Sequence, residues 1–214
     1  PGTLWQPYWK VTNNASTYWY HPHLHEMTLE QITKGIGGLI IVRDEIEAAL
    51  ALPRNYGIDD IPLVLTDRDF NTQNQFTPVP YGDSAMVNMT LRPQYSVPGQ
   101  VVRFRFLNAA IERSFNIGFS DNRNFSVICS DGGLLDAPVS VNRYLLHAGE
   151  RIEIVVDFKN EEGKLFGYNV LISSADTTQS FIETRIKESK KDFRSFVITT
   201  KKFEIQPKLF NVDK

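Results

Sequence analysis

The chain has 214 residues, of which 42% are hydrophobic, 12% aromatic and 22% charged, with a formal net charge of −2; this predicts a folded body with room for one large or two small domains. The two charge signs are interspersed, so a nucleic-acid-binding surface built from clustered Lys and Arg is not expected. No apolar run reaches the roughly 18 residues that a membrane-spanning helix needs, so no membrane span is expected, and no export signal is expected at the N-terminus.

The first 44 residues favour extended structure and an incomplete domain. A stretch rich in Thr and aromatic residues runs up to His21, a short helical signal covers Leu29 to Ile36, and Gly38 to Val42 is an apolar strand. A segment of this length supplies about three or four strands, and so small an open sheet exposes unpaired edges and half a core. Residues 1–44 are therefore predicted to need further protein to pack against.

A domain boundary is predicted at residues 45–60. Glu45 to Leu52 combines Glu, Ala and Leu in a run that favours a short helix, and Pro53 ends that run. The residues from Pro53 to Pro62 are rich in Pro, Gly and Asp, which is typical of a connection between domains. We therefore predict a linker here.

Residues 61–187 are predicted to form one complete β-sandwich. Val101 to Leu107 alternates polar and apolar side chains with the period of two of a half-buried strand, so that Arg103 and Arg105 are expected on its wet face. Arg151 to Phe158 repeats the pattern, and Gly- and Pro-containing turns separate such strands throughout the region. Short strands with frequent breakers indicate an antiparallel sandwich or barrel.

Residues 188–214 are interpreted as a connector that leads to another part of the protein. They mix basic residues with an alternating stretch at Phe196 to Thr199 that favours a strand.

Three of the four histidines, His21, His23 and His25, lie within five positions. Because side chains alternate along an extended chain, His21 and His23 should project to the same side, roughly 6 to 7 Å apart along the backbone. Pro22 donates no ladder hydrogen bond, so the pair is expected at a strand end or edge. Two imidazoles so spaced suit two neighbouring ions of copper, zinc, iron or nickel. An arbitrary His-x-His more often packs or faces water, so the surrounding residues must decide.

Those surrounding residues resemble the end of the first cupredoxin domain of multicopper oxidases, especially laccases and bacterial copper-efflux oxidases. The resemblance is carried by Thr17-Tyr18-Trp19-Tyr20-His21-Pro22-His23-Leu24-His25-Glu26 and by the Gly-Leu-hydrophobic strand within Gly35 to Asp44. The stretches that resemble the second domain of the family are Asp60 to Arg68, Val102 to Asn108, Asp131 to Gly133 and Gly149 to Asp157.

This resemblance implies an all-β chain with a cupredoxin-like Greek-key β-sandwich, containing the end of one domain and one complete domain. Residues 1–44 would be the C-terminal part of cupredoxin domain 1, and residues 45–60 the linker. Residues 61–187 would be cupredoxin domain 2, and residues 188–214 a connector towards a missing third domain.

The resemblance also implies a function for the histidine pair. His21 and His23 would each bind one of the two type 3 coppers of a trinuclear cluster, where dioxygen is reduced to water; a blue copper is expected only in the missing third domain. The implied partners are the remaining segments of the same oxidase, dioxygen, and a phenolic, amine or metal-ion reductant. The implied location is periplasmic or extracellular. The chain contains one of the family's four His-x-His-type motifs, so alone it is expected to be inactive.

The remaining candidates are given structural roles. His25 is expected to support the ligands or lie at the surface, and His147 to belong to a turn. Cys129 lies in an apolar stretch without a neighbouring histidine, so a buried, inert thiol is expected rather than a copper thiolate.

Four further residues are expected to support the framework. Trp19 and Tyr20 are predicted to be core aromatics that orient the ligand strand. Asp131 and Arg151 are predicted to be turn and salt-bridge residues.

Two alternatives belong to other classes. A copper-free relative could keep the cupredoxin frame as a binding or scaffolding module, although packing does not require the His-Pro-His sequence. A two-domain protein similar to nitrite reductases is disfavoured, because residues 61–187 contain no blue-copper motif.

Overall fold

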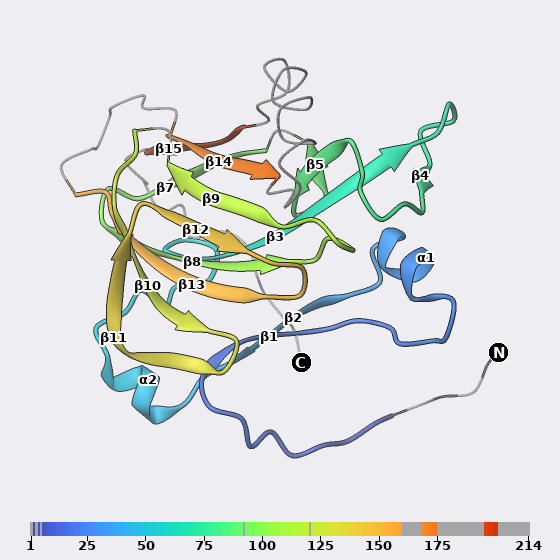
Figure 1. Cartoon of the computed structure of the whole chain (residues 1–214). Helices are drawn as coiled ribbons and strands as arrows, with labels where there is room; N and C mark the ends of the chain where they lie inside the picture. Colours follow the sequence, from blue (N-terminus) through green and yellow to red (C-terminus); the bar gives the residue numbers. More distant parts are fainter. Residues whose placement is uncertain are drawn as a thin grey trace, which may run out of the picture.

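The computed structural model describes residues 2, 4, 6–91, 93–119, 121–159, 168–174 and 195–200, the last two ranges as backbone alone. Two sheets pack face to face, and a smaller N-terminal layer lies against one of them (Figure 1). The predicted all-β class is confirmed. None of the helices in the described ranges is long and apolar enough to cross a membrane.

The larger sheet of the sandwich has eight strands. Its order is β11-β10-β13-β8-β3-β5-β6, and β4 pairs with β3 beside this path. Only the β3–β8 pair of this sheet is parallel among the described pairings. Its strands are β3 (Asp60–Phe70), β4 (Phe76–Thr77), β5 (Ser84–Val87), β6 (Thr90–Leu91), β8 (Val101–Asn108), β10 (Phe125–Ser130), β11 (Gly133–Val141) and β13 (Arg151–Asp157).

The smaller sheet has five strands in the order β12-β9-β14-β15-β7. They are β7 (Gln94–Val97), β9 (Phe115–Phe119), β12 (Arg143–Leu146), β14 (Tyr168–Ser174) and β15 (Ser195–Thr200). Strand β15 pairs with β14 and, in parallel, with β7, so this sheet includes part of the predicted connector at residues 188–214. The rest of that connector lies outside the described residues.

The core lies between the two sheets and is built from the apolar side of the alternating strands. On β8 these residues are Val102, Phe104 and Phe106, which are fully buried as the period of two predicted. Buried phenylalanines meet edge to face across the core, as in the Phe119–Phe158 pair with ring centroids 6.4 Å apart.

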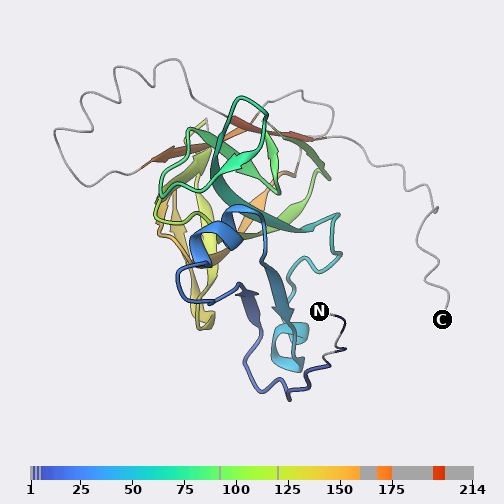
Figure 2. The same cartoon turned by 90° about the vertical axis from the view of Figure 1, so that its right-hand side faces the viewer.

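The N-terminal layer contains β1 (Ser16–Tyr20), α1 (Thr28–Thr33), β2 (Gly38–Val42) and α2 (Glu45–Ala49). Strands β1 and β2 form a separate antiparallel two-stranded sheet, and the described part of residues 1–44 contains these two strands instead of the expected three or four. Figure 2 shows this layer on one side of the sandwich, with β1 and β2 beside each other. Strand β1 lies against β10, β11 and β13 of the larger sheet.

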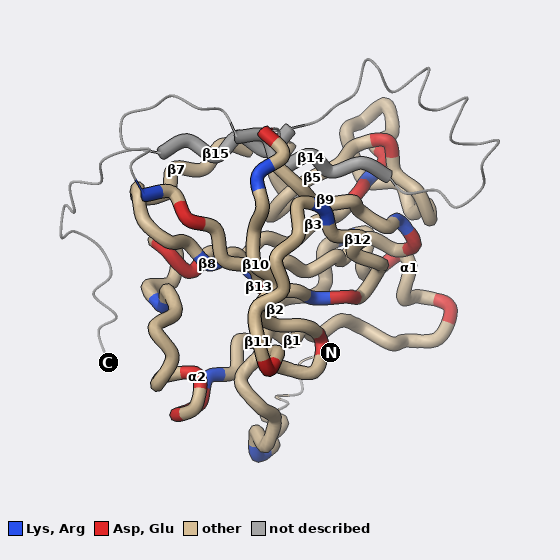
Figure 3. The backbone as a smooth tube through the Cα atoms, turned by 60° about the vertical axis from the view of Figure 1, so that its left-hand side comes forward, with Lys and Arg blue, Asp and Glu red and all other residues tan. Residues whose placement is uncertain are grey.

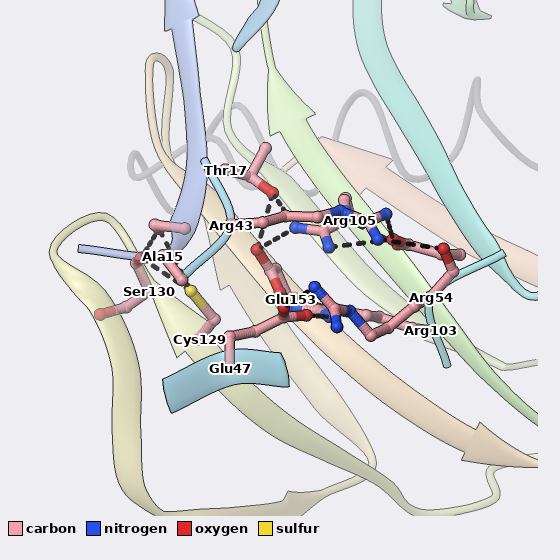
Figure 4. A network of polar contacts seen from close by, with 12 residues as sticks. Ala15, Thr17, Arg43, Glu47, Arg54, Arg103, Arg105, Cys129, Ser130 and Glu153 are labelled. Atoms are coloured by element: carbon pink, nitrogen blue, oxygen red, sulfur yellow. Dashed lines mark hydrogen bonds and ion pairs between the residues drawn. The ribbon is translucent and has the colours of Figure 1, made fainter. Parts of the chain in front are cut away.

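The prediction that one face of β8 is exposed to solvent is wrong. Arg103 and Arg105 are each 1% exposed, because β1 and α2 cover the outer face of the larger sheet and supply polar partners. Arg103 lies between Glu47 of α2 and Glu153 of β13, with Nη1 2.5 Å from Glu47 Oε1 and Nε 2.8 Å from Glu153 Oε2 (Figure 4). The two layers therefore meet across buried ion pairs.

Arg105 forms the second half of this buried network. Its guanidinium donates to both carboxylate oxygens of Asp60, at 2.6 and 2.9 Å, and to Glu153 Oε1 at 2.6 Å. Arg43, which is partly exposed, also donates from Nη2 to Asp60 Oδ2 at 2.7 Å. Basic and acidic residues are interspersed along the described part of the backbone (Figure 3).

Helix α1 is attached to β3 by a buried arginine. Arg68 donates from Nε to Thr33 O at 3.0 Å and from Nη2 to Ile32 O at 2.9 Å, which satisfies carbonyls at the end of α1. Burial lowers the pKa of Arg68. Gly82 leaves room for this strand, because a Cβ there would lie 2.4 Å from the Arg68 backbone nitrogen.

Candidate metal centre

The histidine pair follows the last residue of β1. The chain leaves the strand after Tyr20, passes through His21, Pro22 and His23 without regular structure, and then turns into α1. The rings of His21 and His23 lie side by side, with centroids 4.4 Å apart and planes inclined by 44°. His21 is half-buried and His23 is exposed, so both rings are accessible from outside this chain.

Trp19 also contacts the ring of His21. The two rings stack with centroids 4.1 Å apart and planes inclined by 23°. Trp19 is half-buried rather than part of the central core, and its Cζ2 lies 3.9 Å from the position that a Cβ on Gly149 would occupy. The indole thus lies close both to His21 and to the turn that precedes β13.

The expectation that Tyr20 is a core aromatic is wrong, since its side chain is 56% exposed. Alternation along β1 places Tyr20 on the face opposite Trp19, away from the sandwich. Its ring lies across β2, where a Cβ on Gly38 would be 2.7 Å from the hydroxyl oxygen. Gly38 is opposite Tyr20 in the register of the two strands, so this glycine accommodates the ring.

The two imidazoles provide nitrogen donors suited to copper. The Nδ1 atom of His21 lies 3.2 Å from Pro22 O, and within the described residues the ring of His23 has no hydrogen-bond partner. Neutral imidazole is a borderline ligand for which copper has high affinity. The described residues contain no group of three or more His, Cys, Asp and Glu side chains that could hold a metal ion. The pair therefore offers two nitrogen donors of a type that copper binds, and the described residues add no third ligand to them.

The buried network fixes the strand that carries the pair. Thr17 Oγ1 donates to Glu153 Oε1 at 2.7 Å and accepts from Arg105 Nη1 at 3.0 Å. Arg151 Nε also donates to Thr17 O at 3.2 Å. Strand β1 is therefore tied to β8 and β13 through one residue, four positions before His21.

Asp44 ties the start of β1 to α2. Its carboxylate accepts from Glu47 N at 2.8 Å, as a helix N-cap, and from Ala15 N at 2.9 Å. These two backbone hydrogen bonds lower the pKa of Asp44.

Cys129 is buried in β10, as predicted. Its Sγ lies 3.2 Å from Ser16 Oγ, on the side where β1 crosses the sheet. Burial, followed by the negative charge of Glu153, raises the pKa of the thiol to about 11. The thiol is thus protonated near neutral pH, which disfavours metal binding through sulfur.

The other structural roles are also confirmed. His25 is exposed next to Glu26, with Nδ1 3.7 Å from Oε1. His147 precedes a turn, where its Nδ1 lies 2.8 Å from Ser114 Oγ. Arg151 Nη1 lies 3.0 Å from Asp131 Oδ1. None of these groups meets the His21–His23 pair in a metal-binding group among the described residues.

Sequence reasoning missed the residues that support the pair. The family motif contains Thr17 without indicating a role for it, and the alternating pattern places Glu153 and Arg105 on half-buried strands without indicating their partners. One signal was present: charges of opposite sign occupy equivalent places in two strands of similar pattern, and Glu153 pairs directly with Arg105 in the sheet.

Two family models match the chain, and both are described as multicopper oxidase. One matches residues 59–186 and the other residues 1–47. Curated relatives include the cell division protein FtsP of Shigella dysenteriae, 35% identical over 189 residues, and that of Escherichia coli K12, 34% identical over 189 residues. Each alignment covers 86% of this chain and 40% of the relative, so the chain spans about two fifths of the length of these relatives.

Solved structures agree with this relationship. The laccase-like multicopper oxidase CueO from Ochrobactrum sp. superposes with a TM-score of 0.76 at 32% identity, covering 97% of this chain and 45% of that protein. McoA from Aquifex aeolicus gives a TM-score of 0.74 at 32% identity, covering 92% of this chain and 44% of that protein. The predicted cupredoxin-like β-sandwich is thereby confirmed, and the chain belongs to the multicopper oxidase family.

Proposed function

We propose that the chain is part of a multicopper oxidase in which His21 and His23 each bind one copper of a type 3 pair. The observation that carries this proposal is the placement of two imidazoles, with centroids 4.4 Å apart, directly after β1 in a chain of this family. The complete protein would couple one-electron oxidation of phenols, aromatic amines or metal ions to the reduction of dioxygen to water.

The residues of this chain contribute binding and orientation. His21 and His23 offer ring nitrogens, and the stacked Trp19 restricts the tilt of the His21 ring. Copper held by these residues would supply one-electron redox chemistry. Because two histidines do not complete a trinuclear site, the remaining ligands must come from other segments of the same protein.

The proposed division into domains follows from the same reasoning. Residues 1–44 end cupredoxin domain 1, and residues 45–60 link it to domain 2 at residues 61–187. Residues 188–214, whose strand β15 joins the smaller sheet of the sandwich, lead on towards a third domain. Exposed apolar side chains before and after β1 support a further contact there, since Tyr8 is 93% exposed and Leu24 58% exposed. A periplasmic or extracellular location is part of this proposal.

A copper-free scaffold is the second candidate. It is favoured by the name of the curated relatives, which are called cell division proteins. In that case the sandwich and its N-terminal layer would serve as a binding surface, and the histidine pair would have no metal to hold.

Copper content separates these two functions. The full-length protein that carries this chain would be loaded with Cu²⁺, and bound copper per chain measured together with the absorbance of type 3 and blue copper. His21→Ala and His23→Ala should each lower the copper content and the type 3 absorbance. His25→Ala is the matched control, since it removes an exposed imidazole from the same segment and should change neither. A wild-type protein that binds no copper would establish the scaffold instead.

A further inference from the structure

We propose that Thr17 and Trp19 are positioning residues that orient His21 towards its metal, using β13 and the turn before it as their support. This inference rests on the proposed function, because it concerns how the same histidine pair is held. Neither residue touches the metal ion in this proposal, and both act through His21.

Thr17 fixes the position of β1 through three polar contacts. Its hydroxyl is placed between a donor and an acceptor, Arg105 Nη1 at 3.0 Å and Glu153 Oε1 at 2.7 Å, and its carbonyl accepts from Arg151 at 3.2 Å. Thr17 is completely buried, so water cannot replace these partners. A strand held at this residue cannot slide or rotate without breaking charge-assisted hydrogen bonds.

Trp19 transmits this position to the ligand ring. Trp19 follows Thr17 by two residues, so the two side chains share one face of β1, and His21 is the first residue after the strand. The indole stacks on His21 with ring centroids 4.1 Å apart, and its Cζ2 lies 3.9 Å from the position that a Cβ on Gly149 would occupy. The indole of Trp19 belongs to the strand that Thr17 fixes to the sandwich, so it restricts the orientation of the His21 ring.

The partners of Thr17 and Trp19 come from β13 and from the turn just before it. Thr17 meets Glu153 and Arg151, and Trp19 meets the turn at Gly149 two residues further back. One strand and its preceding turn thus support the whole row of side chains that leads to the metal ligand.

The stack also favours the metal-bound form of His21. An imidazole that binds a metal ion takes on part of the positive charge, and the face of an indole attracts positive charge. Mutation of a group that orients a metal-bound histidine typically lowers the metal affinity by roughly 10- to 100-fold. We therefore expect changes of this size from Thr17 and Trp19.

The test measures copper occupancy in the full-length protein at free Cu²⁺ concentrations set by a chelator buffer. Thr17→Val and Trp19→Leu should raise the free copper concentration needed for half-occupancy of the His21–His23 site by about 10-fold or more. Thr17→Ser keeps the hydroxyl and Trp19→Phe keeps an aromatic face, so both should stay within about 3-fold of wild type. Ile117→Val is the control, because it trims a buried side chain of β9 in the opposite sheet and should leave affinity within about 2-fold.

Each outcome decides between the two proposals. If Thr17→Val and Trp19→Leu bind copper like wild type while His21→Ala does not, the positioning role is wrong and the proposed function stands. If Ile117→Val weakens binding as much as Thr17→Val, the effect is general loss of stability and the positioning role is also wrong. If His21→Ala binds as much copper as wild type, the proposed function itself fails.

Discussion

Replacing Arg105 by methionine removes the positive charge at the centre of the contact between the N-terminal layer and the sandwich. The side chain is 1% exposed and makes two hydrogen bonds to Asp60, one to Glu153 and one to Thr17. Methionine has a similar length and no charge, so the variant leaves two buried carboxylates short of a partner while keeping much of the volume.

The expected loss of stability depends on which positively charged partners the two carboxylates still have in the variant. Removing one partner from a buried ion pair costs about 3 to 5 kcal/mol. Asp60 retains Arg43 at 2.7 Å, and Glu153 retains Arg103 at 2.8 Å. Because both keep one cation, we expect Arg105→Met to lower the free energy of unfolding by about 3 kcal/mol, near the lower end of that range.

Urea unfolding followed by far-ultraviolet circular dichroism measures this quantity. The slope of free energy against urea should stay unchanged, so that the difference reports stability alone. Lys34→Ala is the control, since it removes an exposed ion pair with Glu30 and should change stability by no more than about 0.5 kcal/mol. A loss below about 1 kcal/mol for Arg105→Met would mean that water reaches these carboxylates and that the N-terminal layer does not cover them.

Two further predictions concern packing and pH. Gly82→Ala should destabilise the protein by about 1 to 3 kcal/mol, because its Cβ would meet the backbone of Arg68, whereas Gly132→Ala has open space and should stay within about 0.5 kcal/mol in the same urea assay. The pKa of Cys129 is raised in the folded protein to about 11 from 9.0. Its contribution to stability is therefore complete below pH 9.0 and is lost as the pH rises towards about 11. Wild type should lose more stability than Cys129→Ala across this interval, and equal losses would contradict the raised pKa.

The strands were predictable because their residues alternate locally. Gly38–Val42 has the predicted bounds, and the apolar side of β8 is buried as the period of two required. The two helices lie at the predicted positions but end earlier, at Thr33 and Ala49. Helix ends depend on which carbonyls find partners, and Arg68 supplies those partners to α1 from a distant strand.

The burial of Arg103 and Arg105 could not be read from the alternation. A charged face looks the same in sequence whether it meets water or a layer of opposite charge. The partners Glu47 and Glu153 lie 56 and 50 residues from Arg103, so only the folded arrangement brings them together. The period of two therefore predicts which side chains share a face and leaves open what that face contacts.

The sequence predicts the two imidazoles of the candidate site better than it predicts the residues that surround and orient them. His21 and His23 are distinctive because their type and spacing suit metal binding. The stack of Trp19 on His21 and the exposed place of Tyr20 depend on the room left by Gly38 and the turn at Gly149. Those spaces arise from elements far apart in the chain, so the sequence around the histidines does not contain them.

The histidine pair and the buried framework are separate features of this chain. The imidazoles of His21 and His23 lie at the periphery, whereas the ion pairs that bind the layers together are buried. A substitution at His21 or His23 therefore changes the nitrogen donors offered after β1 without touching the residues that join the layers.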